Sequence, residues 1–418
     1  MSSPNVDAWI TVNLGEVVDI KTGKLDSNYA DEDGKYPFFT CAPNPLRINN
    51  YAFDSEAILL AGNNADGIFH LNFYKGKFNA YQRTYVITAR NQKKLDLGYL
   101  FYNLQLSLNL MRSFSQGTST KFLTMRILND LEIILPNIEI QREISKILSD
   151  LDDKIKTNQR INSSLEAIGQ AVFKRWFVDF EFPNQEGKPY KSSGGEMVFN
   201  QKLEREIPTD WTAAEITEVG KVVDCLHSKK PHRIAIGPVL LQVFNIDKSG
   251  YLDLSDSYNV SEEVYKFWTR NIEVKGGDCV ITNVGRVGAV AQIPEGFTYG
   301  IGRNMTAIRP IRISPTYLIN YLLSEYGVDE IQKNVDSGTI LDSLNVKGII
   351  KIKVLIPSKT VLDSYEALAR LLRKRIEINN SQRFVLSEMR DKLLPKLMSG
   401  KIRVSFTEDN MENRLCSK

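Results

Sequence analysis

Residues Pro136 to Phe180 read PNIEIQREISKILSDLDDKIKTNQRINSSLEAIGQAVFKRWFVDF, and this stretch decides how the rest of the chain is organised. Apolar residues recur along it at spacings of four, three and seven, with one gap of ten in the middle: Ile144, Leu148, Leu151, Ile155, then Leu165, Val172 and Trp176. Such spacing places an apolar seam along one side of a long helix, as in a coiled coil. Two polar residues, Asn158 and Asn162, interrupt the seam near its middle. A helix of this kind needs a partner that buries its seam.

The chain contains a second copy of this stretch, which is found by adding 221 to each residue number. The register holds without a gap over residues 117–176, so that Pro136 corresponds to Pro357 and Asn158 corresponds to Asn379. An internal repeat with a period of about half the chain implies two similar halves and excludes a solenoid of small units.

The start of the second half is recognisable at a smaller offset. Trp9 plus 202 gives Trp211, and Val17-Val18-Asp19 plus 205 gives Val222-Val223-Asp224, which implies a slip of three residues. The middles of the two halves diverge. Both consist of short apolar runs separated by Gly, Pro and Asn, a pattern that predicts a mixed, mostly antiparallel sheet.

These features predict an α+β fold with two mixed α/β domains, separated by two long antiparallel helices that form a coiled-coil spacer around a pseudo-twofold axis. The expected segments are a first domain at 1–136, a long helix at 137–180, a polar linker at 181–206, a second domain at 207–357, a second long helix at 358–400 and a tail at 401–418. Asn158 and Asn379 would meet near the axis and fix the register of the helices. The alternative is that each helix packs only on its own domain.

The composition is that of an ordinary soluble protein, with 42% hydrophobic residues, 25% charged residues and a net charge of +3. Any nucleic-acid surface must therefore come from local clusters of basic residues. The four cysteines show no CxxC spacing, so neither a disulfide framework nor a zinc site is expected. Because the N-terminus lacks signal-peptide features and no apolar run reaches about 18 residues, we expect a cytoplasmic protein without a membrane span.

No motif indicates catalysis or cofactor binding. The chain has no GxxxxGK[ST] phosphate loop, and its three histidines lack the spacing of metal ligands. His227 and His232 lie among basic residues, which favours solvated surface or phosphate contact over metal binding. Gly300-Ile301-Gly302 is not placed between a strand and a helix N-terminus, as a nucleotide-binding loop requires. We therefore expect no catalytic, metal or cofactor site.

The remaining polar residues suit contact with DNA. Lysine and arginine neutralise phosphates, while Asn, Gln and Arg make paired hydrogen bonds to base edges. In the first half the candidates are Lys75, Lys77, Asn79, Tyr81, Gln82 and Arg83, with Gln116, Thr118 and Lys121 in a later loop. If the first of these segments is extended, Asn79, Tyr81 and Arg83 project from one face. The alternative is an ordinary polar strand edge and loop.

The second half offers a similar inventory. The candidates are Lys229, Lys230, Arg233, Asn283, Arg286, Arg303 and Asn304. Asn283 and Arg286 belong to the stretch TNVGRVG, whose glycines allow a backbone to approach a ligand closely.

The ordered set of motifs resembles the DNA-specificity subunits of Type I restriction-modification systems. In the first half the resemblance rests on YPFFTCAP, YAFDSEAILLAG, FNAYQRTYVI, LPNIEIQREISKIL and AIGQAVFKRWFVDFE. In the second half it rests on IPTDW, Gly338-Thr339, VLIP and LSEMRDKLLPKLMSGKI. It covers nearly the whole chain. SKTVLDSYEAL, which begins the second long helix, departs from the pattern because it lacks a pair like Glu139 and Gln141.

The resemblance implies a non-catalytic chain that reads a bipartite target in double-stranded DNA. Each target-recognition domain would read one half-site, and the helices would set the distance between half-sites. The helices and adjoining surfaces would dock two methyltransferase subunits, which bind S-adenosylmethionine and methylate adenine. Restriction and motor subunits that use ATP and magnesium would complete the complex, so no cofactor is expected in this chain.

Two other functions stay open. A self-contained DNA methyltransferase or nuclease with target-recognition domains should carry an Asn/Asp-Pro-Pro-aromatic motif and a glycine-rich cofactor loop, and the sequence contains neither. The other possibility is a structural coiled-coil adaptor with no role in DNA binding.

Overall fold

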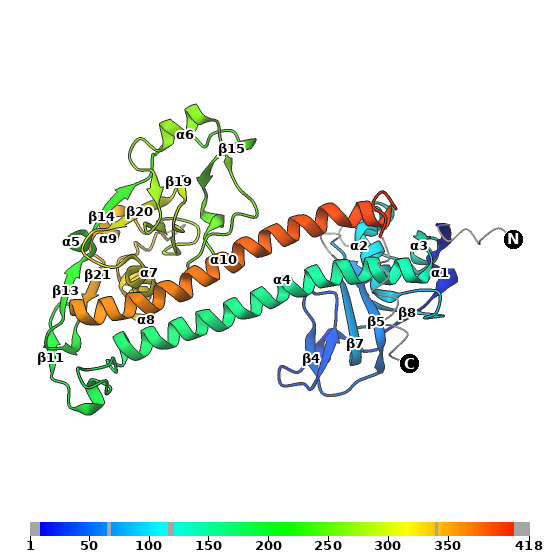
Figure 1. Cartoon of the computed structure of the whole chain (residues 1–418), viewed down its shortest axis with the longest axis horizontal. Coiled ribbons are helices and arrows are strands. Elements are labelled where there is room, and N and C mark those ends of the chain that lie inside the picture. The colour runs from blue at the N-terminus through cyan, green and yellow to red at the C-terminus, as the bar shows by residue number, and fades with distance from the viewer. Residues whose placement is uncertain (1–8, 65–67, 116–120, 339–341, 405–418) are drawn as a thin grey trace. The chain divides into compact units, whose positions relative to one another are not determined.

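The computed structural model describes residues 9–64, 68–115, 121–338 and 342–404. The chain forms a mixed α+β fold that divides into two compact units (Figure 1). Unit 1 comprises Met1–Lys156 and Val385–Lys418, and unit 2 comprises Thr157–Phe384. Both long helices contribute residues to both units, whereas the sequence assigned each helix to a segment of its own. Among the helices of the described ranges, none has a stretch long and apolar enough to cross a membrane.

Unit 1 is built on a six-stranded sheet with the order β2-β8-β5-β7-β3-β4. The strands are Val18–Thr22 (β2), Tyr36–Phe39 (β3), Leu46–Ile48 (β4), Phe53–Ala61 (β5), Leu71–Ala80 (β7) and Thr84–Ala89 (β8). All neighbouring strands are antiparallel except β3 and β7, which run parallel. Residues 57–61 of β5 are all buried. An unbroken apolar run of this kind is typical of a central strand whose sheet is covered on both faces.

Shorter elements complete unit 1. They are β1 (Ile10–Asn13), α1 (Leu14–Val17), a 3₁₀ turn (Ser27–Tyr29), β6 (Asn63–Asn64), α2 (Leu97–Phe114), β9 (Lys121–Phe122), α3 (Met125–Asn129) and β10 (Glu132–Leu135). Asp96 caps the N-terminus of α2, because its carboxylate accepts a hydrogen bond from the Tyr99 amide at 2.8 Å. The buried side of α2 packs into the core of the unit beside Ile144 and Leu148.

Unit 2 contains two smaller sheets, with the orders β14-β20-β17-β18 and β15-β19-β16, and two separate strand pairs. Its strands are β11 (Met197–Asn200), β12 (Arg205–Pro208), β13 (Thr212–Glu215), β14 (Gly220–Asp224), β15 (Ile234–Leu241), β16 (Val274–Lys275), β17 (Cys279–Thr282), β18 (Val290–Gln292), β19 (Thr298–Ile301), β20 (Met305–Pro310) and β21 (Lys353–Ile356). Its shorter helices are α5 (Ile216–Val219), α6 (Glu262–Trp268), α7 (Pro315–Leu323), α8 (Glu325–Lys333) and α9 (Val346–Ile349), with 3₁₀ turns at Lys191–Ser193 and Val243–Asn245.

The same strand connections occur in both units. The order β2-β8-β5-β7 of unit 1 matches β14-β20-β17-β18 of unit 2. The strand pair β1·β10, in which Ile10 lies opposite Leu135, matches the pair β13·β21, in which Thr212 lies opposite Ile356. Corresponding residues therefore differ by 202 near the start of each unit and by 221 near its end.

The offset of 202 extends further than the sequence indicated. Val18 begins β2 and Gly220 begins β14, while Phe39 ends β3 and Leu241 ends β15. The predicted slip of three residues at Val17–Asp19 is therefore wrong. The Val-Val-Asp motif recurs by chance at a neighbouring position, whereas the hydrogen-bonded register of the strands fixes the true correspondence.

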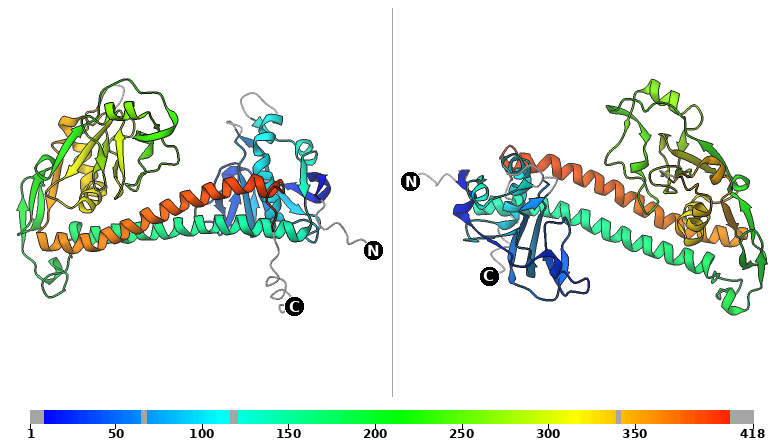
Figure 2. Two further views of the ribbon diagram at one scale, coloured as in Figure 1. Left: turned by 45° about the horizontal axis from the view of Figure 1, so that its top comes forward. Right: turned by 180° about the vertical axis from the view of Figure 1, so that it is seen from behind.

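The long helices are α4 (Ile138–Phe173) and α10 (Lys359–Met398), which run antiparallel within each unit (Figure 2). In unit 1, the Arg390 guanidinium of α10 donates to the Asp152 carboxylate of α4 at 2.8 Å. Ile144 and Leu148 of α4 are buried in a core that also includes Leu394 of α10. Pairing with the other helix and packing on a domain, which the sequence offered as alternatives, thus occur together.

Buried amides meet across the helices of unit 2. Asn379 Nδ2 donates to Asn162 Oδ1 at 2.8 Å, and Asn162 Nδ2 donates to Asn380 Oδ1 at 2.7 Å. Asn158 Nδ2 donates to Gln382 Oε1 at 3.2 Å. The predicted meeting of Asn158 with Asn379 is therefore wrong by about one helical turn. Both side chains are nevertheless buried and hydrogen-bonded across the pair, so they restrict its register.

Some helix ends differ from the sequence prediction. Helix α4 passes into a π-helical turn at Lys174–Val178, where the Asp179 amide donates to the Lys174 carbonyl at 2.9 Å. Ser324 separates α7 from α8: it ends the first helix, and its hydroxyl caps the second by accepting a hydrogen bond from the Gly327 amide. The expected polar linker 181–206 contains β11 and the start of β12.

Replacing Asn162 by alanine tests the buried amides. The Asn379 Nδ2 group would lose its acceptor in a buried place, so we expect a loss of about 1–3 kcal/mol in the free energy of unfolding. Urea denaturation of the full chain measures this loss. Gln159→Ala, at an exposed position of the same helix, is the matched control and should change stability little. Equal stability of the two variants would show that the amides contribute nothing.

Candidate nucleic-acid interface

The turn between β7 and β8 presents three of the predicted DNA-binding residues, Tyr81, Gln82 and Arg83. The Tyr81 amide donates to the Phe39 carbonyl at 2.9 Å, and the Arg83 carbonyl accepts from the Gly62 amide at 2.8 Å. Gln82 and Arg83 are exposed. Backbone bonds thus fix the turn, while its side chains face solvent.

A second group of candidates lies beside this turn. Lys121 belongs to β9, which pairs with β6. The Arg83 guanidinium lies 5.7 Å from the centroid of the Phe122 ring, a cation–π contact. The structure therefore places Arg83 beside strand β9, to which Lys121 belongs. Gln116 and Thr118 themselves lie outside the described residues.

Unit 2 repeats this arrangement at an offset of 221. The Gly302 amide donates to the Leu241 carbonyl at 2.8 Å, and the Asn304 carbonyl accepts from the Asn283 amide at 2.8 Å. Arg303 and Asn304 are exposed. Gln82 of unit 1 thus corresponds to Arg303, and Arg83 corresponds to Asn304.

We name these two groups by their residues. Loop cluster 1 consists of Gly62, Tyr81, Gln82, Arg83, Phe122 and Leu123, and loop cluster 2 consists of Asn283, Gly302, Arg303, Asn304, Ser343 and Leu344. The same backbone hydrogen bond occurs in both clusters. The Leu123 amide donates to the Gly62 carbonyl in cluster 1, and the Leu344 amide donates to the Asn283 carbonyl in cluster 2, each at 2.8 Å. Residues chosen independently in the two halves of the sequence therefore occupy equivalent positions.

The glycine motif Gly300-Ile301-Gly302 leads into the turn of loop cluster 2. A Cβ atom on Gly302 would lie 2.6 Å from the Leu241 carbonyl oxygen, so only glycine permits the approach of the two strands. Asn304 follows with a φ of +62°, a left-handed conformation that asparagine adopts more readily than most residues. The motif thus shapes a turn instead of a nucleotide-binding loop.

Two lysines of β7 face acidic residues of β5. Lys75 lies opposite Glu56, with 3.8 Å between the ammonium and the carboxylate, and Lys77 lies opposite Asp54. The Lys77 ammonium also lies 4.7 Å from the centroid of the Tyr51 ring. Exposed pairs of this kind contribute little to stability, and the nearby carboxylates reduce the positive potential that DNA would meet.

Asn79 takes a structural role in place of the expected base contact. Its side chain is only 4% exposed, and its Nδ2 donates to Asn50 Oδ1 at 2.8 Å while its Oδ1 accepts from the Ala80 amide at 2.9 Å. The expectation that Asn79, Tyr81 and Arg83 share one face is also wrong. Strand β7 ends at Ala80, so the residues that follow belong to a turn without the alternation of a strand.

Asn283 and Arg286 also support the fold. Asn283 Nδ2 donates to Thr306 Oγ1 at 3.0 Å and to the Leu344 carbonyl at 2.8 Å, which fastens loop cluster 2. The Arg286 guanidinium donates to the Ile246 carbonyl. Both side chains are therefore occupied by contacts within unit 2.

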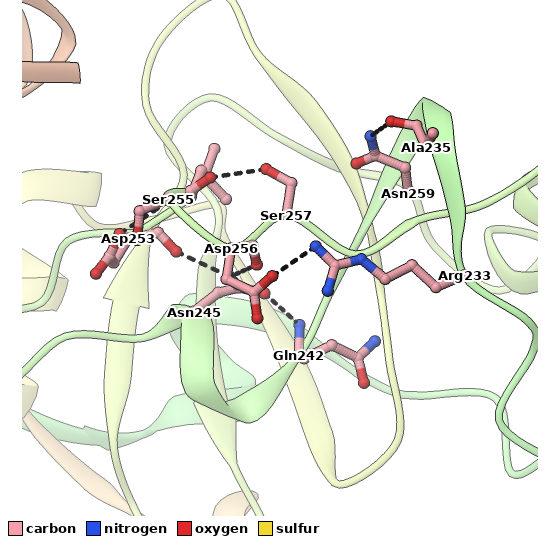
Figure 3. A network of polar contacts seen from close by, with 10 residues as sticks. Arg233, Ala235, Gln242, Asn245, Asp253, Ser255, Asp256, Ser257 and Asn259 are labelled. Atoms are coloured by element: carbon pink, nitrogen blue, oxygen red, sulfur yellow. Dashed lines mark hydrogen bonds and ion pairs between the residues drawn. The ribbon is translucent and has the colours of Figure 1, made fainter. Parts of the chain in front are cut away.

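The basic segment 229–233 folds against a neighbouring loop. Figure 3 shows the Arg233 guanidinium donating to the Asp256 carboxylate. The backbone carbonyl of Asp256 also accepts a hydrogen bond from Asn245 Nδ2. The Tyr258 ring lies under Lys230, 4.5 Å from its ammonium. Lys229 is exposed. These residues form a local basic surface, but the structure does not join them to loop cluster 2.

Three potential metal ligands lie close together after β14. Ligand atoms of Asp224, Cys225 and His227 lie within 4.8 Å of one another. His227 Nε2 and Asp224 Oδ2 are 2.8 Å apart and hydrogen-bonded, and Cys225 is buried in the core of the unit. Burial raises the pKa of the Cys225 thiol, which disfavours the thiolate that a metal requires.

Sequence reasoning missed the parts of both clusters that hold the turns. Gly62 and Phe122 were not predicted as site residues, because neither carries a charge or an amide side chain. The repeat offset of 221 would have found the equivalence, since adding it to residues 81–83 gives residues 302–304.

Asn79→Ala and Gln82→Ala test whether Asn79 supports the fold and Gln82 contacts DNA. Loss of the bonds to Asn50 and Ala80 should lower the free energy of unfolding by about 1–2 kcal/mol, with base preference unchanged. Gln82→Ala should leave stability unchanged and alter base preference. Thermal unfolding and competition binding with variant duplexes measure the two effects. The reverse pattern would show that Asn79 contacts DNA and that Gln82 supports the fold.

Comparison with known proteins agrees with this architecture. Residues 7–167 match the family described as the Type I restriction modification DNA specificity domain. The EcoDI specificity subunit of a Type I restriction enzyme from Escherichia coli is 26% identical over 428 residues, which cover 96% of this chain and 90% of that protein. The MjaIX specificity subunit from Methanocaldococcus jannaschii is 29% identical over 317 residues, covering 74% of this chain and 69% of that protein.

A solved structure shows the same fold. The crystal structure of the Type-I restriction-modification system S subunit from M. genitalium superposes with a TM-score of 0.65 and 17% sequence identity, and the match covers 97% of this chain and 99% of that one. Relatives in sequence and fold thus span both halves of the chain, including both loop clusters. The chain is thus similar over nearly its whole length to Type I restriction-modification specificity subunits, and its residues 7–167 match their DNA specificity domain.

Proposed function

We propose that this chain reads a bipartite DNA target, with each unit contacting one half-site through its loop cluster. The observation that carries the proposal is the equivalence of the two clusters. Each one holds an exposed turn by backbone bonds to the same neighbouring elements, and each turn carries side chains suited to base edges. A chain with two equivalent reading sites suits a target made of two parts.

The side chains of the turns indicate how the half-sites differ. Arginine pairs preferentially with guanine in the major groove, whereas asparagine and glutamine pair with adenine. Loop cluster 1 offers Gln82 followed by Arg83, and loop cluster 2 offers Arg303 followed by Asn304. The order of amide and guanidinium is reversed between the equivalent positions, which supports two half-sites with different sequences.

We further infer that α4 and α10 form a coiled-coil spacer and that a pseudo-twofold axis relates the two units. The shared strand connections, and the offset of 221 that holds through the later part of each unit, support such a relation. The buried amides of the helices support a defined register, because a sliding helix pair would leave them without partners. A spacer with fixed register would hold the half-sites at a fixed separation.

The exposed face of α10 supports a docking role. In unit 2 this helix exposes Leu368, Leu371 and Ile378 by 40%, 67% and 40%. In unit 1 it exposes Val385 and Met389 by 52% and 46%. Apolar residues at helical spacing on a surface mark an interaction site. We assign this face to two methyltransferase subunits, which would bind S-adenosylmethionine and methylate adenine, with ATP- and magnesium-dependent restriction and motor subunits completing the complex.

In this proposal the chain directs chemistry that its partners perform, and it holds no cofactor. An adenine that is methylated must leave the base stack, so the partner needs DNA held in a fixed register. Gel-shift assays with random and target duplexes, with and without the methyltransferase subunit, test the proposal. Weak binding that ignores sequence in both conditions would contradict it. Methylation by this chain alone would favour a self-contained methyltransferase.

Arg83→Ala and Arg303→Ala should each affect one half-site. Loss of a bidentate contact to guanine should weaken binding about 10- to 100-fold, through the first half-site for Arg83 and through the second for Arg303. Mapping methylated adenines in a host that expresses the system gives the target, and competition with duplexes altered in either half gives the assignment. Lys75→Ala, which removes a lysine paired with Glu56, is the control. Equal losses for both halves would contradict the model.

Lengthening both long helices should change the separation of the half-sites. One heptad inserted after Lys156 and another after Phe384 keeps the seam in register and adds about 10 Å, or roughly three base pairs of duplex. Methylated-adenine mapping should then show the same half-sites at a larger spacing. Altered half-site bases at the original spacing would refute the spacer.

A further inference from the structure

A cavity of about 490 Å³ opens within unit 2 beside the long helices. Its apolar wall includes Leu165 and Phe173 of α4 and Leu372 of α10, while Glu166 and Ser249 supply polar groups. Small-molecule sites usually measure about 300–1,000 Å³ and combine apolar walls with a few polar groups. The loop clusters do not contribute to this cavity.

The cavity exists because Gly169 leaves room on α4. A Cβ atom at this position would meet only Leu372 Cδ1, at 4.0 Å. The repeat offset of 221 relates Gly169 to Arg390 of unit 1. There the Arg390 guanidinium donates to Asp152 at 2.8 Å, and the Tyr102 hydroxyl donates to the same carboxylate at 2.7 Å. Unit 1 thus fills with a guanidinium side chain the position that unit 2 leaves open.

Glu166 places a carboxylate at this open position. It precedes Gly169 by three residues and therefore lies on the same face of the helix. Its oxygen accepts a hydrogen bond from Ser249 Oγ at 3.2 Å, and within the described ranges it makes no ion pair. Burial raises the pKa of Glu166, and the charge of Asp247 adds to this effect, while the Ser249 bond and the charge of Arg383 oppose it. A cation in the cavity would stabilise the carboxylate.

The arginine at the cavity is held by contacts within unit 2. Arg373 is 7% exposed, and its guanidinium donates to the carbonyls of Gly250 at 2.9 Å and Gln292 at 3.4 Å. It also lies 4.3 Å from the centroid of the Tyr251 ring and 3.3 Å from the Glu377 carboxylate. Its charge is therefore balanced within the protein, so Arg373 forms a wall and does not attract an anion.

We propose that this cavity binds a small organic cation with an apolar body, whose amidinium, guanidinium or ammonium group lies against Glu166. The apolar body would rest on Leu165, Phe173 and Leu372. The site is independent of DNA reading, which uses the loop clusters.

Benzamidine and its neutral isostere benzamide test the proposal with the full chain. Isothermal titration calorimetry should show benzamidine binding at least ten-fold more tightly than benzamide. Glu166→Gln should weaken benzamidine binding at least ten-fold. Asp363→Asn, which removes an exposed carboxylate on α10 with the same change of charge, should leave binding unchanged.

Gly169→Arg provides a second, independent variant. The new side chain would fill the cavity, so benzamidine binding should be lost. Equal affinity for the two probes, or benzamidine binding that survives in both the Glu166 and the Gly169 variants, would overturn the proposal. Sequence-specific DNA binding of Gly169→Arg, measured in parallel, keeps failure of this site distinct from failure of the proposed function.

Discussion

The apolar faces of α4 and α10 cannot remain in water, and the rest of the structure depends on how they are covered. In unit 1, Ile144 and Leu148 of α4 share a core with Leu394 of α10. In unit 2, the rings of Phe173 and Tyr365 meet edge to face with centroids 5.9 Å apart. Apolar contact alone would tolerate sliding of one helix along the other. The buried amides remove that freedom, because displacement by one turn would leave donors without acceptors in a dry environment.

Sequence reasoning predicted the long helices and two similar halves with mixed sheets, since heptad spacing and an internal repeat are strong signals. It misplaced the partner of Asn158, because a repeat locates the centre of a helix pair only to within a turn, and the longer side chain of Gln382 decides the contact. It also treated Asn79 and Arg83 alike. Their side chains are equally suited to DNA, but one lies inside a strand and the other in a turn, and only tertiary packing distinguishes them.

The change of offset from 202 to 221 locates the main difference between the units. It falls after β3 in unit 1 and after β15 in unit 2, before the central strands β5 and β17. The longer segment of unit 2 contains α6 (Glu262–Trp268) and the loop that binds Arg233. A common frame of strands thus carries inserts of different length. This arrangement explains why the ends of the two halves match in sequence while their middles do not.

The turns at residues 81–83 and 302–304 are held by main-chain atoms, and this has an evolutionary consequence. Any residue that tolerates the local backbone can replace Gln82, Arg83 or Arg303 without breaking a bond that the fold requires. If these turns read DNA as proposed, a lineage can acquire a new target one substitution at a time, with every intermediate still folded. Loss of an old recognition sequence and gain of another need not pass through an unstable protein.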